Sequence, residues 1–258
     1  MSDGPLAGYR VLVTRPALQA DELVAAIESA GGEAIRFPVI QIIGHDPDVI
    51  SGEFASMPRP DIAIFVSVNA VLYGLDPVRS SGAAIAAVGP STKMAIEAAG
   101  VAVSISVDDG FDSESLLGHP ALNDVSDKTV TIVRGENGRE ILGNTLRDRG
   151  ADVNYLATYR RSIRQAAEDE FQLLEERWDR GEIDCVTVLS VETLENLLLQ
   201  LPSASLEALR RTLLVAPGAR VIQTAKELVP GISAVMASGP RTADILNALI
   251  KARQSGQP

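Results

Sequence analysis

The segment Arg134–Arg139 groups residue types that suit the binding of an anion. It reads Arg-Gly-Glu-Asn-Gly-Arg and directly follows the apolar run Val130–Val133. Glycine lets a backbone approach a ligand closely, and arginine can pair with a carboxylate through two hydrogen bonds. The lysine and the spacing of a phosphate-binding G-x-x-x-x-G-K-[ST] loop are missing. A ligand-binding loop is therefore predicted, with a solvated turn as the alternative, and its residues are Arg134, Gly135, Glu136, Asn137, Gly138 and Arg139.

Tyr159 is the second candidate, because it lies in a polar segment between Thr158 and the pair Arg160-Arg161. A phenol in this position could donate a proton or a hydrogen bond to a ligand, with its acidity enhanced by the neighbouring cations. The alternative is a tyrosine that packs against its domain and leaves its hydroxyl in water. The local sequence alone leaves both interpretations open.

Further polar residues and glycines recur wherever an apolar strand gives way to a helix. Ligands of open α/β sheets bind at the carboxyl ends of the strands, where helix N-termini present free N–H groups. Each residue alone is weak evidence, because Ser, Thr and Asn also cap helices for structural reasons. If two lobes face each other, all these turns surround one cleft. The candidates are Thr14, Arg15, Ser67, Val68, Asn69, Gly89, Pro90, Ser91, Thr92, Asp112, Ser113, Glu114, Ser190, Pro217, Gly218, Arg241 and Thr242.

Composition excludes several classes of function. The formal net charge is −11, which argues against nucleic acid or an anionic membrane as the main partner, since phosphate binding depends on clustered Lys and Arg. With 2 His and 1 Cys, metal sites built on these residues and Ser-His-Asp triads are nearly excluded. No G-x-G-x-x-G dinucleotide fingerprint occurs at a first strand-to-helix turn. We expect a small-molecule ligand and no metal.

The single cysteine, Cys185, cannot form an internal disulfide, which fits a reducing cytoplasm. It lies in the apolar run 183–189 with no basic neighbour, so we expect a small buried hydrophobic side chain and not a catalytic thiol. The N-terminal sequence lacks the pattern of a signal peptide, and no apolar run reaches the roughly 20 residues of a membrane span. These features predict a cytoplasmic protein, which we expect to be a monomer.

Apolar runs alternate with amphipathic segments along the whole chain. The runs are expected to form strands, and we place them at 11–13, 34–37, 62–66, 84–88, 101–107, 130–133, 186–189 and 213–215. Alternating strands and helices imply right-handed crossovers and parallel, doubly wound sheets of the flavodoxin-like kind. At 258 residues, two domains are the better expectation.

The second half of the chain repeats the first at a distance of about 120–129 residues. The strand, loop and helix that begin at Val130 match those that begin at Val11, and Val186–Ser190 matches Ile62–Ser67. The extended segments Phe37–Ile43 and Leu156–Ile163 occupy equivalent places and are predicted to cross between two lobes. An internal duplication in which each copy gives its first strand–helix unit to the other lobe is therefore predicted.

Taken in order, these motifs resemble the uroporphyrinogen-III synthase family over nearly the whole chain. The resembling segments are VLVTRP at Val11, FVSVNAV at Phe65, AVGPSTKMAIEAAGV at Ala87, DSESLL at Asp112, VRGENGRE at Val133 and TYRR at Thr158. The resemblance implies two α/β lobes joined by a two-stranded linker. It places residues 1–38 with 162–258 in one lobe and 42–158 in the other, with linkers at 38–43 and 156–163.

The resemblance also implies a reaction. The family cyclises hydroxymethylbilane, a linear tetrapyrrole with eight carboxylates, to uroporphyrinogen III with loss of water and inversion of ring D. The path runs through an azafulvene cation and a spiro-pyrrolenine, without cofactor or metal. Tyr159 matches the tyrosine that assists departure of the hydroxyl, and Ser67, Thr92, Ser190 and the Arg134 loop match cleft positions. The turn at Pro217 lacks the hydroxyl residues of some members. The rival hypothesis is a non-enzymatic two-lobed protein that binds a small anion.

Overall fold

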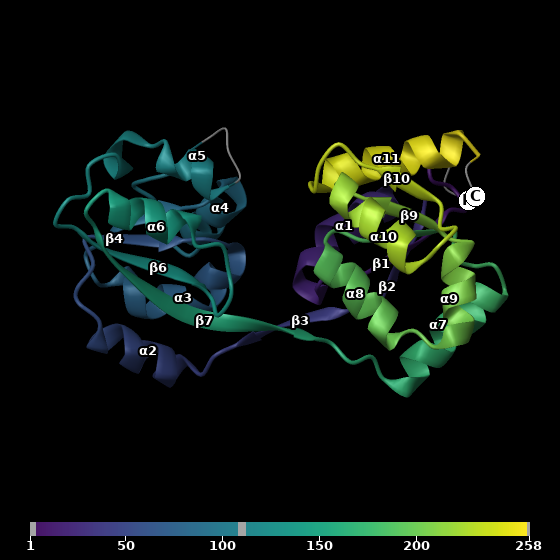
Figure 1. Ribbon diagram of the computed structural model, residues 1–258, viewed down its shortest axis with the longest axis horizontal. Helices are drawn as coiled ribbons and strands as arrows, with labels where there is room; N and C mark the ends of the chain where they lie inside the picture. The colour runs from purple at the N-terminus through teal and green to yellow at the C-terminus, as the bar shows by residue number, and fades with distance from the viewer. Residues whose placement is uncertain (1–3, 108–111, 257–258) are drawn as a thin grey trace. The chain divides into compact units, whose positions relative to one another are not determined.

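The computed structural model describes residues 4–107 and 112–256, and the chain folds in it as two units (Figure 1). Unit 1 comprises Met1–Gln41 with Ser162–Pro258, and unit 2 comprises Ile42–Arg161. Both crossings between the units fall in the neighbouring strands β3 (Ile40–Gly44) and β7 (Asp152–Ile163). Within these described residues, no helix is long and apolar enough to cross a membrane.

Unit 1 holds a five-stranded sheet in the order β10-β9-β8-β1-β2, in which all four neighbouring pairs of strands are parallel. Its side chains alternate between the two faces, and helices α1 and α11 cover the face that carries Val11, Val13 and Leu213. The strands are β1 (Arg10–Val13), β2 (Glu33–Arg36), β8 (Cys185–Thr187), β9 (Leu213–Ala216) and β10 (Ala234–Met236). The helices are α1 (Ala17–Ser29), α7 (Glu168–Asp179), α8 (Val191–Gln200), α9 (Ser203–Arg210), α10 (Ala219–Leu228) and α11 (Thr242–Gln254).

Unit 2 holds a second five-stranded sheet in the order β3-β7-β6-β4-β5. Strands β4, β5, β6 and β7 run parallel, with Ile64 beside both Ala86 and Ile132. Besides β3 and β7, the strands are β4 (Ile62–Phe65), β5 (Ala84–Ala87) and β6 (Thr129–Gly135). The helices are α2 (Pro47–Ser56), α3 (Val68–Arg79), α4 (Pro90–Ala98), α5 (Ser113–Leu117) and α6 (Ile141–Asp148), with a 3-10 turn at Pro120–Leu122.

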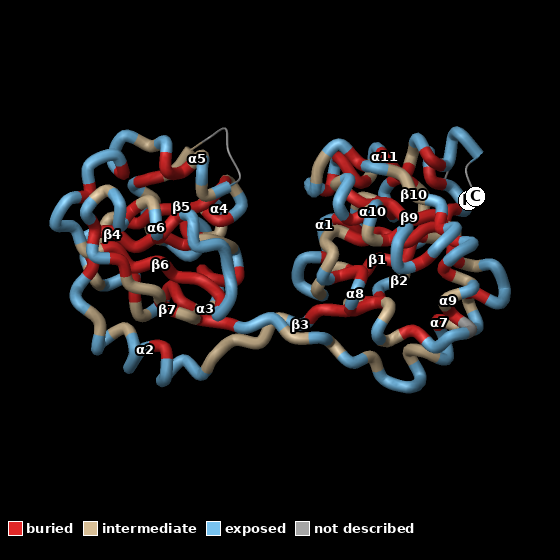
Figure 2. The backbone as a smooth tube through the Cα atoms, in the orientation of Figure 1, coloured by how far each residue is buried: buried red, intermediate tan, exposed pale blue. Residues whose placement is uncertain are grey.

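Hydrophobic side chains cover both faces of the unit 2 sheet, and Figure 2 shows its strands β4, β5 and β6 as almost continuously buried. Helices α5 and α6 cover the face that carries Ile64 and Ile132. Helices α2, α3 and α4 cover the opposite face, which carries Phe65 and Val133. Because both faces are packed, a ligand can reach the sheet only at its edges or at the ends of its strands.

One expected strand does not form. Of the run 101–107, only Ile105 pairs with the sheet, through an isolated bridge to Ala86. The amides of Ser104 and Ile105 both donate to the Ile85 carbonyl, at 2.8 and 3.1 Å. In a regular parallel pair the hydrogen bonds are evenly spaced along the strands, and two adjacent amides that share one carbonyl break this spacing. Residues 109–111 of the turn that follows lie outside the described residues, and the turn is described from Asp112 onward.

Candidate functional site

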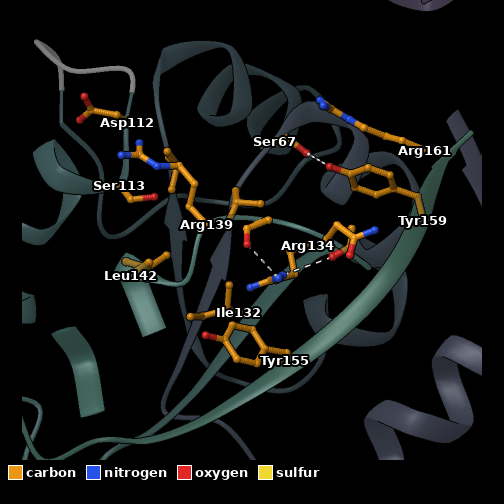
Figure 3. A pocket seen from close by; sticks show the side chains of 15 residues that line it. Ser67, Asp112, Ser113, Ile132, Arg134, Arg139, Leu142, Tyr155, Tyr159 and Arg161 are labelled. Atoms are coloured by element: carbon orange, nitrogen blue, oxygen red, sulfur yellow. Dashed lines mark hydrogen bonds between the residues drawn. The ribbon is translucent and has the colours of Figure 1, made fainter. Parts of the chain in front are cut away.

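A cavity of about 390 Å³ opens in unit 2 where β4, β5 and β6 end, beside β7 (Figure 3). The candidate residues that line it are Ser67, Asp112, Ser113, Arg134, Gly135, Asn137, Gly138, Arg139 and Tyr159. The rest of the lining is Val66, Val88, Ile132, Leu142, Tyr155 and Arg161. The Arg134 loop and Tyr159, which are far apart on the chain, thus share one cavity.

A β-bulge at Thr158 brings Tyr159 to this position. Arg134 pairs with Ala157, but the next residue, Gly135, pairs with Tyr159, so Thr158 is an extra residue in β7. Its carbonyl accepts the backbone N–H of His45 at 3.0 Å. A one-residue shift moves a side chain to the other face of a sheet. Tyr159 accordingly packs with Leu156, whereas Tyr155 packs against the cluster on the opposite face.

The Tyr159 ring is nearly enclosed, with 7% of the residue exposed. Gly135 lies directly against it, since a β-carbon there would be 2.8 Å from Cε2 and 3.0 Å from Cζ of Tyr159. The Tyr159 hydroxyl lies 3.1 Å from Ser67 Oγ, and either oxygen can be the donor. Figure 3 shows this contact at the end of the ring that points away from β7. Tyr159 belongs to unit 2, whose boundary follows Arg161, so the strand carries it within this unit and not across to the other.

Arg134 is largely buried, and its guanidinium holds the loop that follows it. Nε donates to the Gly135 carbonyl at 3.2 Å, and Nη2 donates to the Gly138 carbonyl at 3.4 Å. Nη1 donates to Glu140 Oε1 at 2.8 Å. One side chain therefore contacts the beginning, the middle and the end of its own loop. This arrangement fixes the loop before any ligand arrives.

Tyr155 completes this network below the loop. Its hydroxyl donates to Glu140 Oε2 at 2.7 Å, and the Arg134 guanidinium lies 4.5 Å from its ring centroid. Burial, followed by the hydrogen bond to Glu140, raises the pKa of the Tyr155 phenol. The hydrogen bonds from Tyr155 and then from Arg134 lower the pKa of the Glu140 carboxyl. Both shifts favour the charge-assisted arrangement that is present, an ionised Glu140 beneath a neutral phenol.

Arg139 and Asp112 line the opposite part of the cavity (Figure 3). Arg139 Nη2 lies 2.6 Å from Glu114 Oε1, and Nη1 donates to Oε2 at 3.3 Å, so the two side chains pair through both oxygens. Asp112 caps α5 by accepting the Ser115 hydroxyl and amide, and these bonds lower the pKa of its carboxyl. The Arg139 side chain is 67% exposed, which leaves it accessible to a ligand.

The remaining predicted residues of unit 2 do not line the cavity. Glu136 donates its N–H to the Tyr159 carbonyl at 2.9 Å and pairs with His45 Nε2 at 3.1 Å. Gly89 has φ of 80° before α4, a conformation that favours glycine. The others are two buried residues, Asn69 and Thr92, one half-buried residue, Pro90, and three exposed ones, Val68, Ser91 and Glu114. The structure assigns these residues to helix starts and to the loop.

The predicted residues of unit 1 also lie where its strands end. Thr14 is fully buried and donates to the Thr187 carbonyl at 2.6 Å. Arg15 donates to the Pro240 carbonyl at 2.6 Å, and burial lowers the pKa of its guanidinium. Ser190 caps α8 by accepting the N–H of Thr193 at 3.1 Å. Pro217 and Gly218 precede α10, where Gly218 is the N-cap without a side-chain bond.

Tyr155, Ile132 and Leu142 were not predicted as lining residues. The two-residue alternation of β7 from Val153 gives the signal for Tyr155, because it places this side chain on the face covered by α5 and α6. Ile132 and Leu142 carry no such signal, because apolar residues in a strand and a helix are expected in the core.

No group of three or more His, Cys, Asp or Glu that could hold a metal ion occurs within residues 4–107 and 112–256. Cys185 is fully buried, as predicted, and burial raises the pKa of its thiol. A buried thiol with a raised pKa is a poor nucleophile.

A model of the family described as "Uroporphyrinogen-III synthase HemD" matches residues 21–247. The chain belongs to the uroporphyrinogen-III synthase family. It is 29% identical to the uroporphyrinogen-III synthase of Escherichia coli strain K12, over 72% of this chain and 78% of that protein. It is also 29% identical to the enzyme of Proteus mirabilis, over 73% of this chain and 96% of that protein.

Solved structures of the uroporphyrinogen-III synthase family share the fold. A mutant uroporphyrinogen III synthase from the extremely thermophilic bacterium Thermus thermophilus superposes with a TM-score of 0.57 at 23% identity, over 96% of this chain and 99% of that one. Uroporphyrinogen-III synthetase from Helicobacter pylori 26695 gives a TM-score of 0.59 at 15% identity, over 96% and 100% of the two chains. The predicted α/β fold with parallel sheets is thereby confirmed.

Proposed function

We propose that this protein is a uroporphyrinogen-III synthase, which cyclises hydroxymethylbilane to uroporphyrinogen III with loss of water and inversion of ring D. The match of the family model to residues 21–247 carries the proposal. The unit 2 cavity supports it, because a buried phenol and an accessible arginine line the same space.

The arginines have distinct roles in this proposal. Arg134 is largely buried and already bonded to Gly135, Gly138 and Glu140, so it shapes the loop. Arg139 is accessible and its guanidinium already pairs with a carboxylate through two nitrogens. A substrate carboxylate can take the place of Glu114 on Arg139 with the same geometry. Arg139 is therefore the residue that meets a carboxylate of the bilane.

Of the two tyrosines in the cavity, Tyr159 is the proton donor. The Tyr155 hydroxyl donates to Glu140 Oε2, so its hydrogen is engaged in the network. The Tyr159 hydroxyl contacts Ser67 Oγ, an oxygen that can itself be the donor, which leaves the phenolic hydrogen available to a ligand. This difference in hydrogen-bond partners supports Tyr159 as the proton donor, in addition to the resemblance of its sequence context.

The chemistry begins when the Tyr159 proton moves to the hydroxyl oxygen of the bilane. The carbon–oxygen bond breaks, water leaves with the electron pair, and the pyrrole nitrogen supplies electrons to form the azafulvene cation. The substituted carbon of ring D attacks it to give the spiro-pyrrolenine, which fragments and recloses inverted. The proton released when the last pyrrole regains its aromaticity restores the phenol. Holding the two ends of the bilane together contributes most of the acceleration.

The two units derive, in this proposal, from a duplication in which the first strand–helix units exchanged places. The strand order β9-β8-β1-β2 of unit 1 parallels the order β5-β4-β6-β7 of unit 2. In addition, β10 follows β9 at the edge of unit 1, and Ile105 bridges to β5 at the corresponding edge of unit 2. In this correspondence β1 takes the place of β6. Strand β1 comes from the first half of the sequence, although most strands of its sheet come from the second half, and the reverse holds for β6.

Incubation of the protein with hydroxymethylbilane tests the enzymatic function. Without an enzyme the bilane closes to the type I isomer, so separation of the isomers by liquid chromatography reports catalysis directly. We expect mainly type III product, in an amount that rises with protein concentration. Type I product alone, together with saturable binding of the bilane, would instead support the rival hypothesis of a non-enzymatic binding protein.

A further inference from the structure

Ser67 contacts both the start of a helix and the reacting phenol. Its Oγ accepts the N–H of Ala70 at 3.1 Å, which makes Ser67 the N-cap of α3. The same Oγ lies 3.1 Å from the Tyr159 hydroxyl. We propose, on the basis of the function proposed above, that Ser67 is a positioning residue for Tyr159 and not a ligand of the substrate. It donates its hydrogen to the phenolic oxygen and so directs the phenolic hydrogen into the cavity.

The hydrogen-bonding capacity of the two hydroxyls supports this direction. Ser67 Oγ accepts one hydrogen bond from Ala70, and its own hydrogen remains available. If Ser67 donates to Tyr159, the phenol must place its hydrogen elsewhere. The ring cannot turn away, because Gly135 lies against it and the Tyr73 ring centroid lies 6.3 Å away. The accessible space around Tyr159 is the cavity that it lines.

The same contact stabilises the charge that the reaction creates. When the Tyr159 O–H bond breaks and its proton passes to the departing hydroxyl group, the phenolate oxygen carries the negative charge. The Ser67 hydroxyl then donates to an anion, and such hydrogen bonds are stronger than neutral ones. Ser67 also marks the N-terminus of α3, a helix of 12 residues whose dipole is positive at this end. The phenol regains its proton at the end of the cycle, so Ser67 is not consumed.

Two substitutions separate this role from helix capping. In Ser67→Gly the helix start keeps most of its stability, since glycine costs only a few tenths of a kcal/mol at an N-cap. We expect kcat for type III formation to fall about tenfold, as for loss of a hydrogen bond to a charged group, and KM to change less than about twofold. Ser67→Thr retains the hydroxyl and restores most of kcat. Ser81→Ala is the matched control, because Ser81 Oγ accepts the Ala83 N–H at 3.2 Å just beyond the other end of α3.

The decisive readout is the double variant Ser67→Gly with Tyr159→Phe. If Ser67 acts through Tyr159, the serine substitution has no further effect on kcat once the phenolic hydroxyl is gone. If the losses of kcat in the two single variants multiply in the double variant, the inference is overturned. It is also overturned if Ser67→Gly raises KM and leaves kcat unchanged, because that result identifies Ser67 as a ligand of the substrate. Type I product alone from the wild-type protein would contradict the proposed function itself, so the two failures are distinguishable. Circular dichroism and thermal unfolding of each variant confirm that it is folded.

Discussion

Ser67 in unit 2 and Ser190 in unit 1 have the same local structure but different partners. Both follow a central strand, both have extended backbone, and both accept the N–H three residues on at 3.1 Å. Ser67 Oγ then contacts the hydroxyl of Tyr159, whereas Ser190 Oγ contacts Thr193 Oγ1 within its own helix at 2.8 Å. The residue type at the turn therefore sets the helix start, and a strand that does not itself pair with the turn's own strand determines whether the turn can take part in chemistry.

Strands β7 of unit 2 and β2 of unit 1, which each lie one strand beyond the neighbour of the serine's own strand, differ through one extra residue. In unit 2, the shift at Thr158 turns Tyr159 toward Ser67. In unit 1, β1 and β2 pair in unbroken register up to Val13 and Arg36, and β2 ends there. Two turns with similar sequence patterns thus acquire different surroundings from a local change in strand pairing.

Gly135→Ala is expected to have the largest effect on the contact that distinguishes Ser67 from Ser190, because the added methyl group pushes Tyr159 away from Ser67. The added carbon would lie 2.8 Å from the Tyr159 ring and 3.2 Å from the Tyr159 carbonyl. We expect a loss of about 1–3 kcal/mol in unfolding free energy from overpacking, and a fall in type III formation of more than tenfold. Gly52→Ala is the control, since nothing lies within 4 Å of its added carbon and α2 gains a better helix former. Equal activity in both variants would show that the position of the ring is unimportant.

Removal of each cap should affect the two helices equally. Ser67→Ala and Ser190→Ala each lose one N-cap bond, worth about 1 kcal/mol. Amide hydrogen exchange, resolved by helix, should show α3 and α8 opening roughly fivefold more often in the respective variants. A much larger effect in α3 would mean that the Tyr159 contact contributes mainly to stability, and would weaken the functional distinction between the two serines.

Glu140→Gln tests the network that fixes the unit 2 loop. The pKa of Glu140 is lowered from its ordinary value of 4.5, first by the Tyr155 hydroxyl and then by Arg134. Because the pKa is lower in the folded state than in the unfolded state, the ionised carboxylate stabilises the fold above pH 4.5. This stabilisation is lost as the pH falls through the pKa of Glu140 in the folded state. The difference in melting temperature between wild type and variant should therefore be largest at neutral pH and should decrease below pH 4.5. A difference that is constant from pH 3 to pH 7 would contradict an ionic role.

The smallest expected effect concerns the pair of Arg139 with Glu114. Both side chains are substantially exposed, at 67% and 42%, so their interaction is weak in water. In Glu114→Gln, Arg139 is more available to the substrate, and KM should fall by up to about fivefold at low salt, with less change at high salt. Glu176→Gln matches the change in net charge, because Glu176 pairs with Arg180 in unit 1. An equal fall in KM in both variants would attribute it to net charge alone.

Much of this architecture can be predicted from the sequence. Continuous apolar runs such as Ile62–Phe65 and the glycines after helices identify buried strands and their order along the chain. Arg134 and Tyr159 stand out by residue type and setting, and they line one cavity. An apolar run also predicted a strand at residues 101–107, but there only Ile105 pairs with the sheet, and the amides of Ser104 and Ile105 share one carbonyl.

The contacts that give the site its chemistry could not be predicted in this way. The bulge at Thr158 leaves no mark in the two-residue alternation of β7, yet it decides which face Tyr159 occupies. The pairing of Arg139 with Glu114 joins residues 25 positions apart, one in the Arg134 loop and the other in the first turn of α5. The guanidinium of Arg134 is engaged by carbonyls of its own loop, and we therefore propose that this arginine, a ligand donor by its sequence pattern, acts mainly by holding the loop.

The initial rate of type III formation by Tyr159→Phe tests the central claim most directly. Phenylalanine keeps the ring that packs against Gly135 and removes the hydroxyl that contacts Ser67. We predict a rate at least about tenfold below wild type, a lower bound that lies beneath the roughly 100-fold or more that a positioned general acid typically contributes. Tyr73→Phe, which removes a hydroxyl from the neighbouring ring, should retain the wild-type rate. An unchanged rate in Tyr159→Phe would contradict its role as the proton donor.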